Sequence, residues 1–157
     1  MTPLGLDMGT IDGIDRQILG ALQRNARLSR AELARLVGLS PSAVADRIRR
    51  LEDSRVILGY SAVVDPKKLG YGIDVIMRLS PETGQLRNIA KVAAATPEVV
   101  ECHRVTGEDC YVMHIVLASI DELEELIDRF TPLGRTTTSI VNGTPVPRRA
   151  IPLDRSR

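Results

Sequence analysis

Three arginines stand close together in the stretch GLSPSAVADRIRRL, which covers residues 38–51. A guanidinium carries several N–H donors in one plane, so it can bind phosphate oxygens or the acceptor edge of guanine. The small residues before the arginines would let a helix backbone approach base edges, and a helix N-terminus favours phosphate. The stretch therefore predicts contact with double-stranded DNA, although a helix surface whose arginines only face water is the alternative. The predicted DNA-binding residues are Ser40, Ser42, Ala43, Asp46, Arg47, Arg49 and Arg50.

The segment from Thr106 to Asp109 offers a second kind of chemistry. Backbone N–H groups of a glycine turn can hold a carboxylate, and the side chain of Asp109 can hold an ammonium group. An amino acid carries both groups, so these residues predict a small-molecule effector site. In the alternative interpretation, Gly107 only forms a hairpin turn.

Both cysteines and both histidines lie near this turn, but their order argues against a metal site. Cys102 and His103 are neighbours in a predicted strand, so their side chains point to opposite faces. At most three of the four residues, which include Cys110 and His114, could then converge on one ion. The sequence contains no recognisable catalytic triad pattern and no phosphate-binding glycine loop. We therefore expect no metal, no cofactor and no enzymatic activity.

The composition is typical of a folded, water-soluble chain: 43% of the 157 residues are hydrophobic and 26% are charged. No apolar run approaches the ~18 residues that a membrane span requires, and we expect a cytoplasmic protein with no membrane contact. Residues 1–70 carry eleven Lys and Arg against eight Asp and Glu, whereas residues 71–145 carry six against eleven. This asymmetry is expected if only the first half contacts a polyanion.

Capping signals divide the first half into three short helices. Each signal places a side-chain oxygen or a glycine where the backbone groups of a helix end need a partner. The predicted caps are Asp12, Ser29 with Glu32, Gly38, and Ser40 with Pro41 in the first turn. The second and third helices are joined by a short turn that contains Gly38, which is typical of a helix-turn-helix motif. The third helix, which holds the arginines, would enter the major groove of DNA.

The remaining segments predict a second domain of mixed type. Residues 56–64 are rich in β-forming residues and predict a strand that serves as a wing or leads out of the DNA-binding module. Alternation and helical spacing then predict the order strand, helix, strand, strand, helix, strand, which is the ferredoxin-like order. The strands are expected at 73–79, 99–105, 110–117 and 136–141, and the helices at 83–95 and 119–133. One face of this sheet would carry no helix, so we expect at least a homodimer.

The predicted fold class is α+β, with an N-terminal winged helix-turn-helix domain and a C-terminal ferredoxin-like βαββαβ sandwich domain. The expected boundaries are 1–60 for the DNA-binding domain, 61–71 for a linker strand and hinge, 72–145 for the ligand-sensing and oligomerisation domain, and 146–157 for a basic tail. We expect this tail to be a mobile extension.

Most of the chain resembles the Lrp/AsnC family of bacterial and archaeal transcription regulators. The matching positions run through both domains in order: Ile11-Asp12, Asp15, Ile18-Leu19, Arg27, Ser29, Glu32-Leu33-Ala34, Gly38-Leu39-Ser40, Val44, Arg47-Ile48, Leu51-Glu52, Ile57, Gly59-Tyr60, Leu69-Gly70, Val100-Glu101-Cys102, Gly107, Asp109 and Thr138-Ser139-Ile140-Val141. One departure is Ser54-Arg55, where the family usually has a glycine before the strand.

The resemblance implies a DNA-binding regulator that senses a small molecule, usually an amino acid, in its C-terminal domain. It also implies dimers that assemble further, often into octamers, and an effector pocket at a subunit interface. The positions that match this pocket are Thr106, Gly107, Glu108, Asp109, Thr136 and Thr138. A nucleoid-associated location in the cytoplasm follows from this function.

Two alternatives belong to other functional classes. An architectural DNA-binding protein without an effector would share every DNA-binding feature, so only a response to ligands separates it from a regulator. Sirohaem decarboxylases also resemble this two-domain fold, and His103 or His114 would then serve catalysis. That enzyme requires a basic cleft, whereas residues 71–145 are acidic overall.

Overall fold

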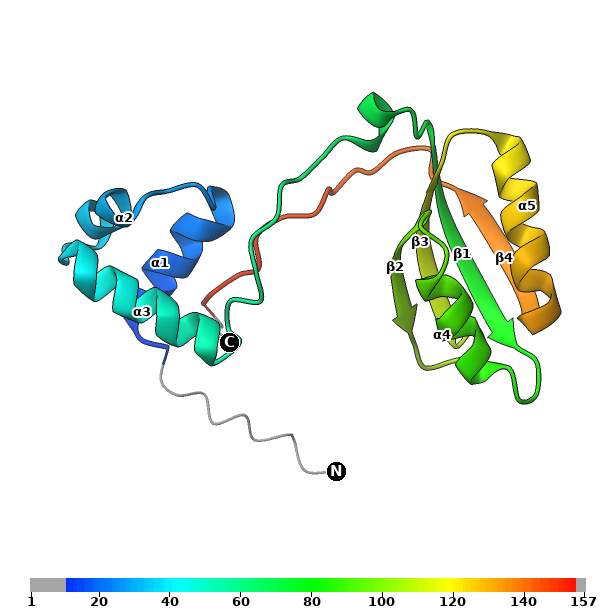
Figure 1. Cartoon of the computed structure of the whole chain (residues 1–157), viewed down its shortest axis with the longest axis horizontal. Helices are drawn as coiled ribbons and strands as arrows, with labels where there is room; N and C mark the ends of the chain where they lie inside the picture. Colours follow the sequence, from blue (N-terminus) through cyan, green and yellow to red (C-terminus); the bar gives the residue numbers. More distant parts are fainter. Residues whose placement is uncertain (1–10, 155–157) are drawn as a thin grey trace. The chain divides into compact units, whose positions relative to one another are not determined.

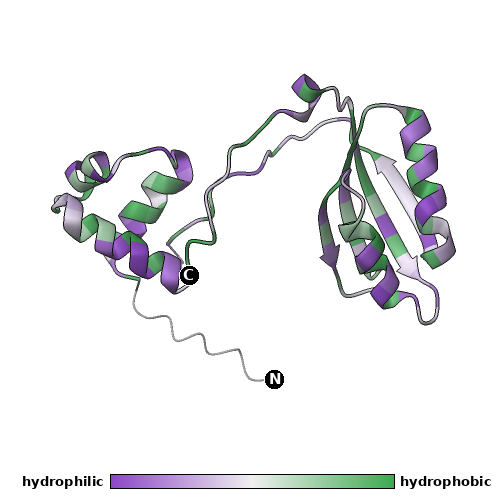
Figure 2. Ribbon diagram, viewed as in Figure 1, coloured by the Kyte–Doolittle hydropathy of each residue, from purple (hydrophilic) through white to green (hydrophobic). Residues whose placement is uncertain are grey.

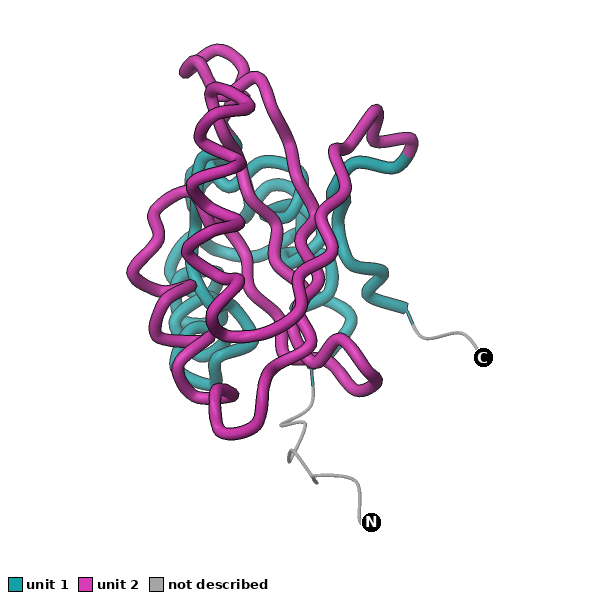
Figure 3. The backbone as a smooth tube through the Cα atoms, turned by 90° about the vertical axis from the view of Figure 1, so that its right-hand side faces the viewer, with its two compact units in different colours: residues 1–63, 146–157 teal, residues 64–145 magenta. Residues whose placement is uncertain are grey.

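The computed structural model describes residues 11–154 and divides the chain into two compact units. Unit 1 comprises residues 1–63 and 146–157, and unit 2 comprises residues 64–145 (Figures 1 and 3). The C-terminal segment therefore belongs to the same unit as the N-terminal helices. Among residues 11–154, no helix is long and apolar enough to cross a membrane.

Three helices form unit 1: α1 (Gly13–Arg24), α2 (Arg30–Val37) and α3 (Pro41–Asp53). Their starts confirm the predicted caps, because Asp12, Ser29 and Ser40 each accept a hydrogen bond from the backbone N–H three residues later. Gly38 ends α2 with φ 70°, a left-handed conformation that glycine adopts without strain. The small core between the helices consists of Ile18, Ala21, Leu33, Ala34 and Val44. The predicted helix-turn-helix motif is thus confirmed.

The predicted strand over residues 56–64 is wrong. This segment is extended but has no strand partner within the described chain, and Leu58 and Val63 are 81% and 101% exposed. β-forming residues produce a strand only where another strand supplies backbone hydrogen bonds, so residues 11–154 of a single chain form no wing here. Arg55 has φ 57°, which is the left-handed conformation that the family's usual glycine would adopt easily. A short 3₁₀ helix, η1 (Pro66–Leu69), follows in unit 2.

Unit 2 confirms the predicted ferredoxin-like order. Its elements are β1 (Ile73–Pro81), α4 (Leu86–Ala94), β2 (Val99–Arg104), β3 (Tyr111–Leu117), α5 (Ile120–Phe130), the 3₁₀ turn η2 (Thr131–Leu133) and β4 (Gly134–Ile140). The strands form one antiparallel sheet in the order β2-β3-β1-β4 (Figure 1). Strands β2 and β4 are therefore the two edges of the sheet.

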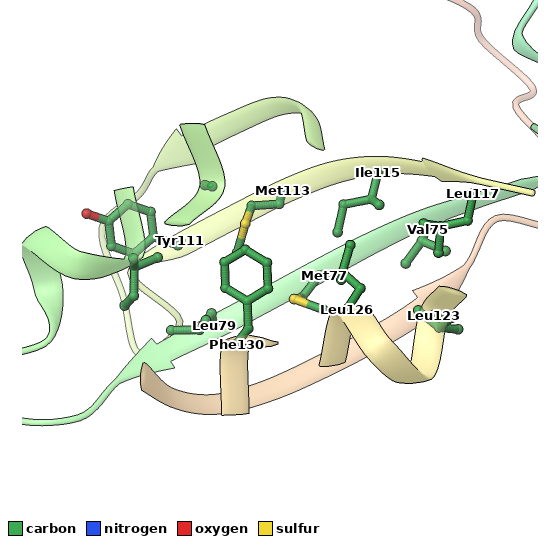
Figure 4. Packing of buried hydrophobic residues seen from close by; sticks show 12 residues of the cluster. Val75, Met77, Leu79, Tyr111, Met113, Ile115, Leu117, Leu123, Leu126 and Phe130 are labelled. Atoms are coloured by element: carbon green, nitrogen blue, oxygen red, sulfur yellow. The ribbon is translucent and has the colours of Figure 1, made fainter. Parts of the chain in front are cut away.

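The core of unit 2 lies between this sheet and the two helices. Alternate residues of β1 and β3 point toward α4 and α5 and are fully buried, as Met77 and Met113 show beside Phe130 (Figure 4). The Tyr111 hydroxyl donates a 2.7 Å hydrogen bond to the backbone oxygen of Leu86, so its polar end is satisfied within the core. The pale colour of β4 in Figure 2 reflects its run of threonine and serine residues. Within unit 2, residues 64–145, the opposite face of the sheet carries no helix (Figure 1).

Candidate nucleic-acid and effector sites

The N-terminal end of α3 presents small polar residues to solvent. The Ser40 hydroxyl accepts a 3.2 Å hydrogen bond from the Ala43 N–H and lies 3.0 Å from the Ser42 hydroxyl. Ser42 is exposed and Ala43 is half-buried, so neither side chain blocks approach to the helix backbone. This helix end can therefore accept a phosphate or lie close to base edges.

Two of the three predicted arginines are available on the exposed side of α3. Arg49 is 67% exposed and forms a 3.2 Å ion pair with Asp46 one helical turn away. Arg50 is 63% exposed, and its guanidinium lies 3.4 Å from the Asp15 carboxylate. A guanidinium has five donors, so one such contact leaves others free to bind phosphate. These side chains and Ser42 form a surface that suits DNA.

Arg47, the third predicted arginine, forms two ion pairs within unit 1. Its guanidinium lies 2.6 Å from Asp12 and 2.8 Å from Asp15, and only 23% of the side chain is exposed. Asp15 is almost fully buried at the start of α1 and needs a positive partner. Arg47 therefore joins α3 to the start of α1, and its role as a DNA contact stays a prediction.

Charge and hydrogen bonding reinforce each other in this cluster. The Asp15 N–H and the Arg47 guanidinium hold the pKa of the Asp12 carboxyl below its usual value. The hydrogen bond that the Arg47 guanidinium donates to Asp12 raises the pKa of Arg47 most, and its hydrogen bond to Asp15 raises it further. A second cap behaves similarly, because the Ser29 hydroxyl and N–H lower the pKa of Glu32. The charged forms of all three side chains are thus favoured in the folded unit.

The predicted effector turn joins β2 to β3, and Asp109 is held in place there. One oxygen of its carboxylate accepts a 3.3 Å hydrogen bond from the Ser80 hydroxyl, and the other lies 3.4 Å from the Arg78 guanidinium. Arg78 is 49% exposed and Asp109 is 31% exposed, so both groups of this pair reach solvent. Gly107 has φ 117°, which an L residue with a side chain rarely adopts. Thr106 and Glu108 are exposed beside them.

The strand register places Thr136 and Thr138 away from this pair. Thr138 lies opposite Met77, whose side chain points toward the helices, so the Thr138 side chain points the same way. Thr136 lies two residues before Thr138 in the strand and shares this direction. Arg78 and Ser80 point toward the helix-free face instead. One chain therefore does not bring the two threonines together with Asp109.

The comparisons with known proteins agree with this architecture. An AsnC-type helix-turn-helix domain matches residues 11–52, and an Lrp/AsnC ligand binding domain matches residues 74–151. YezC, an uncharacterised helix-turn-helix transcriptional regulator of Bacillus subtilis, is 41% identical over 131 residues, which cover 83% of this chain and 93% of the relative. The chain belongs to the Lrp/AsnC family.

Other Lrp/AsnC members extend the match to solved structures. LrpA of Mycobacterium tuberculosis is 35% identical over 137 residues, covering 85% of this chain and 91% of the relative. The structure of Bacillus subtilis LrpC covers 88% of this chain and 99% of its own, with a TM-score of 0.84 and 29% identity. A Neisseria meningitidis regulator in complex with L-Met covers 92% and 98%, with a TM-score of 0.86 and 27% identity.

Membership of the Lrp/AsnC family makes this protein a DNA-binding transcriptional regulator. The matched relatives are named transcriptional regulators, which confirms the prediction of a protein that is not an enzyme. In the structure, Cys102 lies opposite Met113 and His103 lies opposite Val112, so these neighbours point to opposite faces of the sheet. His103 is 3.5 Å from Glu101, and His114 is 2.6 Å from Asp74.

The structure also corrects the expectation of a mobile tail in this Lrp/AsnC chain. Residues 146–154, here called the C-terminal strap, are docked on unit 1. The Gln23 side chain donates to the Ile151 oxygen at 3.1 Å and accepts from the Ile151 N–H at 2.7 Å. A Cβ added to Gly20 would lie 3.5 Å from Leu153, so the leucine packs against α1. Residues 155–157 lie outside the described part.

Replacing Gln23 by alanine is expected to loosen this strap. Both hydrogen bonds to Ile151 would be lost, and at an exposed site the free energy of local opening should fall by roughly 1 kcal/mol. Hydrogen exchange of the Ile151 amide measures the change. Gln17→Ala is the matched control, because Gln17 is an exposed glutamine on the same helix. Equal exchange rates in both variants would contradict the role of Gln23.

Proposed function

We propose that a small amino-acid effector, bound at a subunit interface of unit 2, modulates the assembly or the DNA affinity of this regulator. The observation that carries the proposal is the Arg78 and Asp109 pair. Its positive and negative groups lie 3.4 Å apart, and both are partly exposed. A free amino acid presents a carboxylate next to an ammonium, so Arg78 would bind the first and Asp109 the second.

Two further features support an interface site. The Neisseria meningitidis relative was solved with L-Met, so an amino acid binds a protein of this fold. The predicted effector residues fall into two groups: Thr106, Gly107, Glu108 and Asp109 at the turn, and Thr136 and Thr138 on the edge strand β4. Because one chain keeps these groups apart, a second chain would have to bring them together.

The helix-free face of the sheet is the surface we propose for a homodimer. It carries the half-buried apolar residues Ile76, Val112 and Val116 beside the His114 and Asp74 pair. A single copy leaves these apolar side chains partly in water, and a second copy would cover them. Further assembly into a larger oligomer such as an octamer, and action on the nucleoid in the cytoplasm, belong to the same proposal.

The DNA contacts are proposed for the exposed end and side of α3. Ser40, Ser42 and Ala43 would lie nearest the DNA at the helix N-terminus, and Arg49 and Arg50 would bind phosphate or guanine. Asp46 limits the positive charge of this surface and orients Arg49. Arg47 would hold this surface in place, because its ion pairs with Asp12 and Asp15 join α3 to α1.

Arg49→Ala is expected to weaken binding to the DNA upstream of the protein's own coding region by about tenfold, because one charged contact would be lost. The slope of log affinity against log salt concentration should also fall by about one. Fluorescence anisotropy at two salt concentrations measures both quantities. Lys68→Ala removes a positive charge from η1 in unit 2 and should change neither. An unchanged salt slope in the Arg49 variant would exclude a phosphate contact.

Asp109→Asn is expected to abolish the response to effector while leaving DNA binding without effector unchanged. The amide keeps the hydrogen bond from Ser80 but cannot neutralise an ammonium. The experiment titrates the protein on its DNA with each of the twenty amino acids. Glu82→Gln is the control for charge, since Glu82 is exposed after β1. If the wild-type protein ignores all twenty amino acids, the architectural alternative is favoured.

A further inference from the structure

Helix α3 ends in a residue that is unusual for the position it occupies. Arg55 follows the C-cap Ser54 and has φ 57°, and it is one of two non-glycine residues with positive φ in the described part of the chain. In this left-handed conformation the Cβ of an L residue comes too close to the following carbonyl oxygen, so glycine is the usual residue at such a helix end. Arg55 therefore carries a conformational cost that a glycine would avoid.

The backbone of this helix end is complete without the Arg55 side chain. The N–H of Arg55 donates to the Glu52 oxygen at 2.9 Å, and the N–H of Val56 donates to the Leu51 oxygen at 2.9 Å. These two bonds form the Schellman arrangement, which satisfies the last carbonyl groups of a helix. A glycine would supply the same bonds with less strain. The need to end α3 therefore does not explain an arginine at this position.

The Arg55 side chain also makes no contact that offsets this cost. It is exposed, and within residues 11–154 its guanidinium forms no hydrogen bond or ion pair. The nearby Glu52 carboxylate instead accepts a 2.9 Å hydrogen bond from the Tyr60 hydroxyl. An exposed cation at a helix C-terminus gains less from the helix dipole than the left-handed conformation costs. The five donors of the Arg55 guanidinium are thus left for a partner outside this part of the chain.

Arg55 lies on a positively charged segment that includes the proposed DNA contacts. Residues 11–63 carry nine arginines against six acidic residues. Arg50, on the exposed side of α3, precedes Arg55 by about one and a half helical turns. Duplex DNA carries phosphates along its whole length, so a duplex held at Arg49 and Arg50 would present further phosphates near the end of α3.

We propose that Arg55 binds a DNA phosphate next to those held by Arg49 and Arg50. This contact compensates for the left-handed conformation, which is how strained residues persist at functional positions. Phosphate is the expected partner because Arg55 lies beyond the end of the helix that would enter the major groove. The inference rests on the proposed DNA contacts of α3 and adds a residue to them. Removal of the Arg55 side chain should therefore stabilise unit 1 and weaken its complex with DNA.

Arg55→Gly in the full chain tests both of these effects. Relief of strain should raise the transition temperature of unit 1 by roughly 4–8 °C in calorimetry. Loss of one phosphate contact should weaken binding to the DNA upstream of the coding region by about tenfold and lower the slope of log affinity against log salt concentration by about one. Fluorescence anisotropy at two salt concentrations measures both quantities. An unrelated duplex should lose the same factor, because a phosphate contact does not read sequence.

Two matched variants separate strain from charge. Arg55→Lys keeps the positive charge and the left-handed backbone, so its transition temperature and salt slope should match those of the wild type. Arg27→Gly makes the same chemical change in an exposed turn of ordinary negative φ, so it should not raise the transition temperature. A rise in stability that is confined to Arg55→Gly assigns the strain to this position.

Three results would overturn the inference. The first is an Arg55→Gly variant that binds DNA with the affinity and salt slope of the wild type. Arg49→Ala, measured beside it, shows whether the proposed surface of α3 stands without Arg55. The second is an Arg55→Gly variant whose transition temperature does not rise. The third is an Arg55→Lys variant that loses as much affinity as Arg55→Gly, which would exclude a phosphate contact made by charge.

Discussion

Asp15→Ala is expected to unfold unit 1 at a temperature at which unit 2 stays folded. The Asp15 carboxylate accepts the Asp12 N–H at 3.2 Å and the Arg47 guanidinium at 2.8 Å, and it is 2% exposed. Its removal opens the cap of α1 and leaves the Arg47 guanidinium of α3 without its buried partner. We expect the free energy of unfolding of unit 1 to fall by about 2–4 kcal/mol.

A loss of this size matters because unit 1 has a small core and a correspondingly small margin of stability. Calorimetry should show one transition at a lower temperature and a second transition unchanged, and DNA binding should be lost with the first. Asp46→Ala is the matched control: Asp46 is 71% exposed, and its ion pair with Arg49 lies on the surface. Similar transitions in both variants would show that the Asp15 cluster is not required.

Gly134→Ala is expected to have the largest effect in unit 2. A Cβ at this position would lie 2.2 Å from the Ser80 carbonyl oxygen and 2.9 Å from the Pro81 Cα, both of which are backbone atoms of the neighbouring strand. The strands cannot keep their pairing with this contact, since Gly134 lies directly opposite Pro81. The backbone of Gly134 is extended, so the glycine is required for space. We expect a loss of about 3 kcal/mol or more in the free energy of unfolding of unit 2.

The measurement is again calorimetry, in which only the transition of unit 2 should move. Gly143→Ala makes the same chemical change at a position where an added Cβ has no neighbour within 4 Å, so it serves as the control. A Gly134 variant with the wild-type transition would mean that β1 and β4 can separate at this end without cost.

Local signals explain why so much of the fold could be predicted. The start of each helix in unit 1 depends on a cap within three residues, and Asp12, Ser29 and Ser40 are read directly from the sequence. In unit 2, alternation along β1 and β3 distinguishes the buried face from the other face. The same alternation could have placed Arg78 and Ser80 on the helix-free face, because each lies an odd number of residues from the buried Met77.

The features that were missed depend on contacts between distant residues. Residues 56–64 have strand composition, but a strand also needs a partner that the sequence does not specify. The ion pair of Arg47 joins positions separated by 32 residues, and the contact of Gln23 with Ile151 joins positions separated by 128. The run Arg-Thr-Thr-Thr-Ser in β4 has no alternation, so its register and faces could not be assigned from sequence.

The C-terminal strap makes unit 1 a discontinuous domain into which unit 2 is inserted. Residues 64–145 are synthesised after α3 and before the C-terminal strap, which docks on α1. During translation, the three helices can therefore form early, but their contact with Ile151 waits until unit 2 has been made. A fragment that ends at residue 63 would lack this contact permanently. Its stability would underestimate that of the same helices in the full chain.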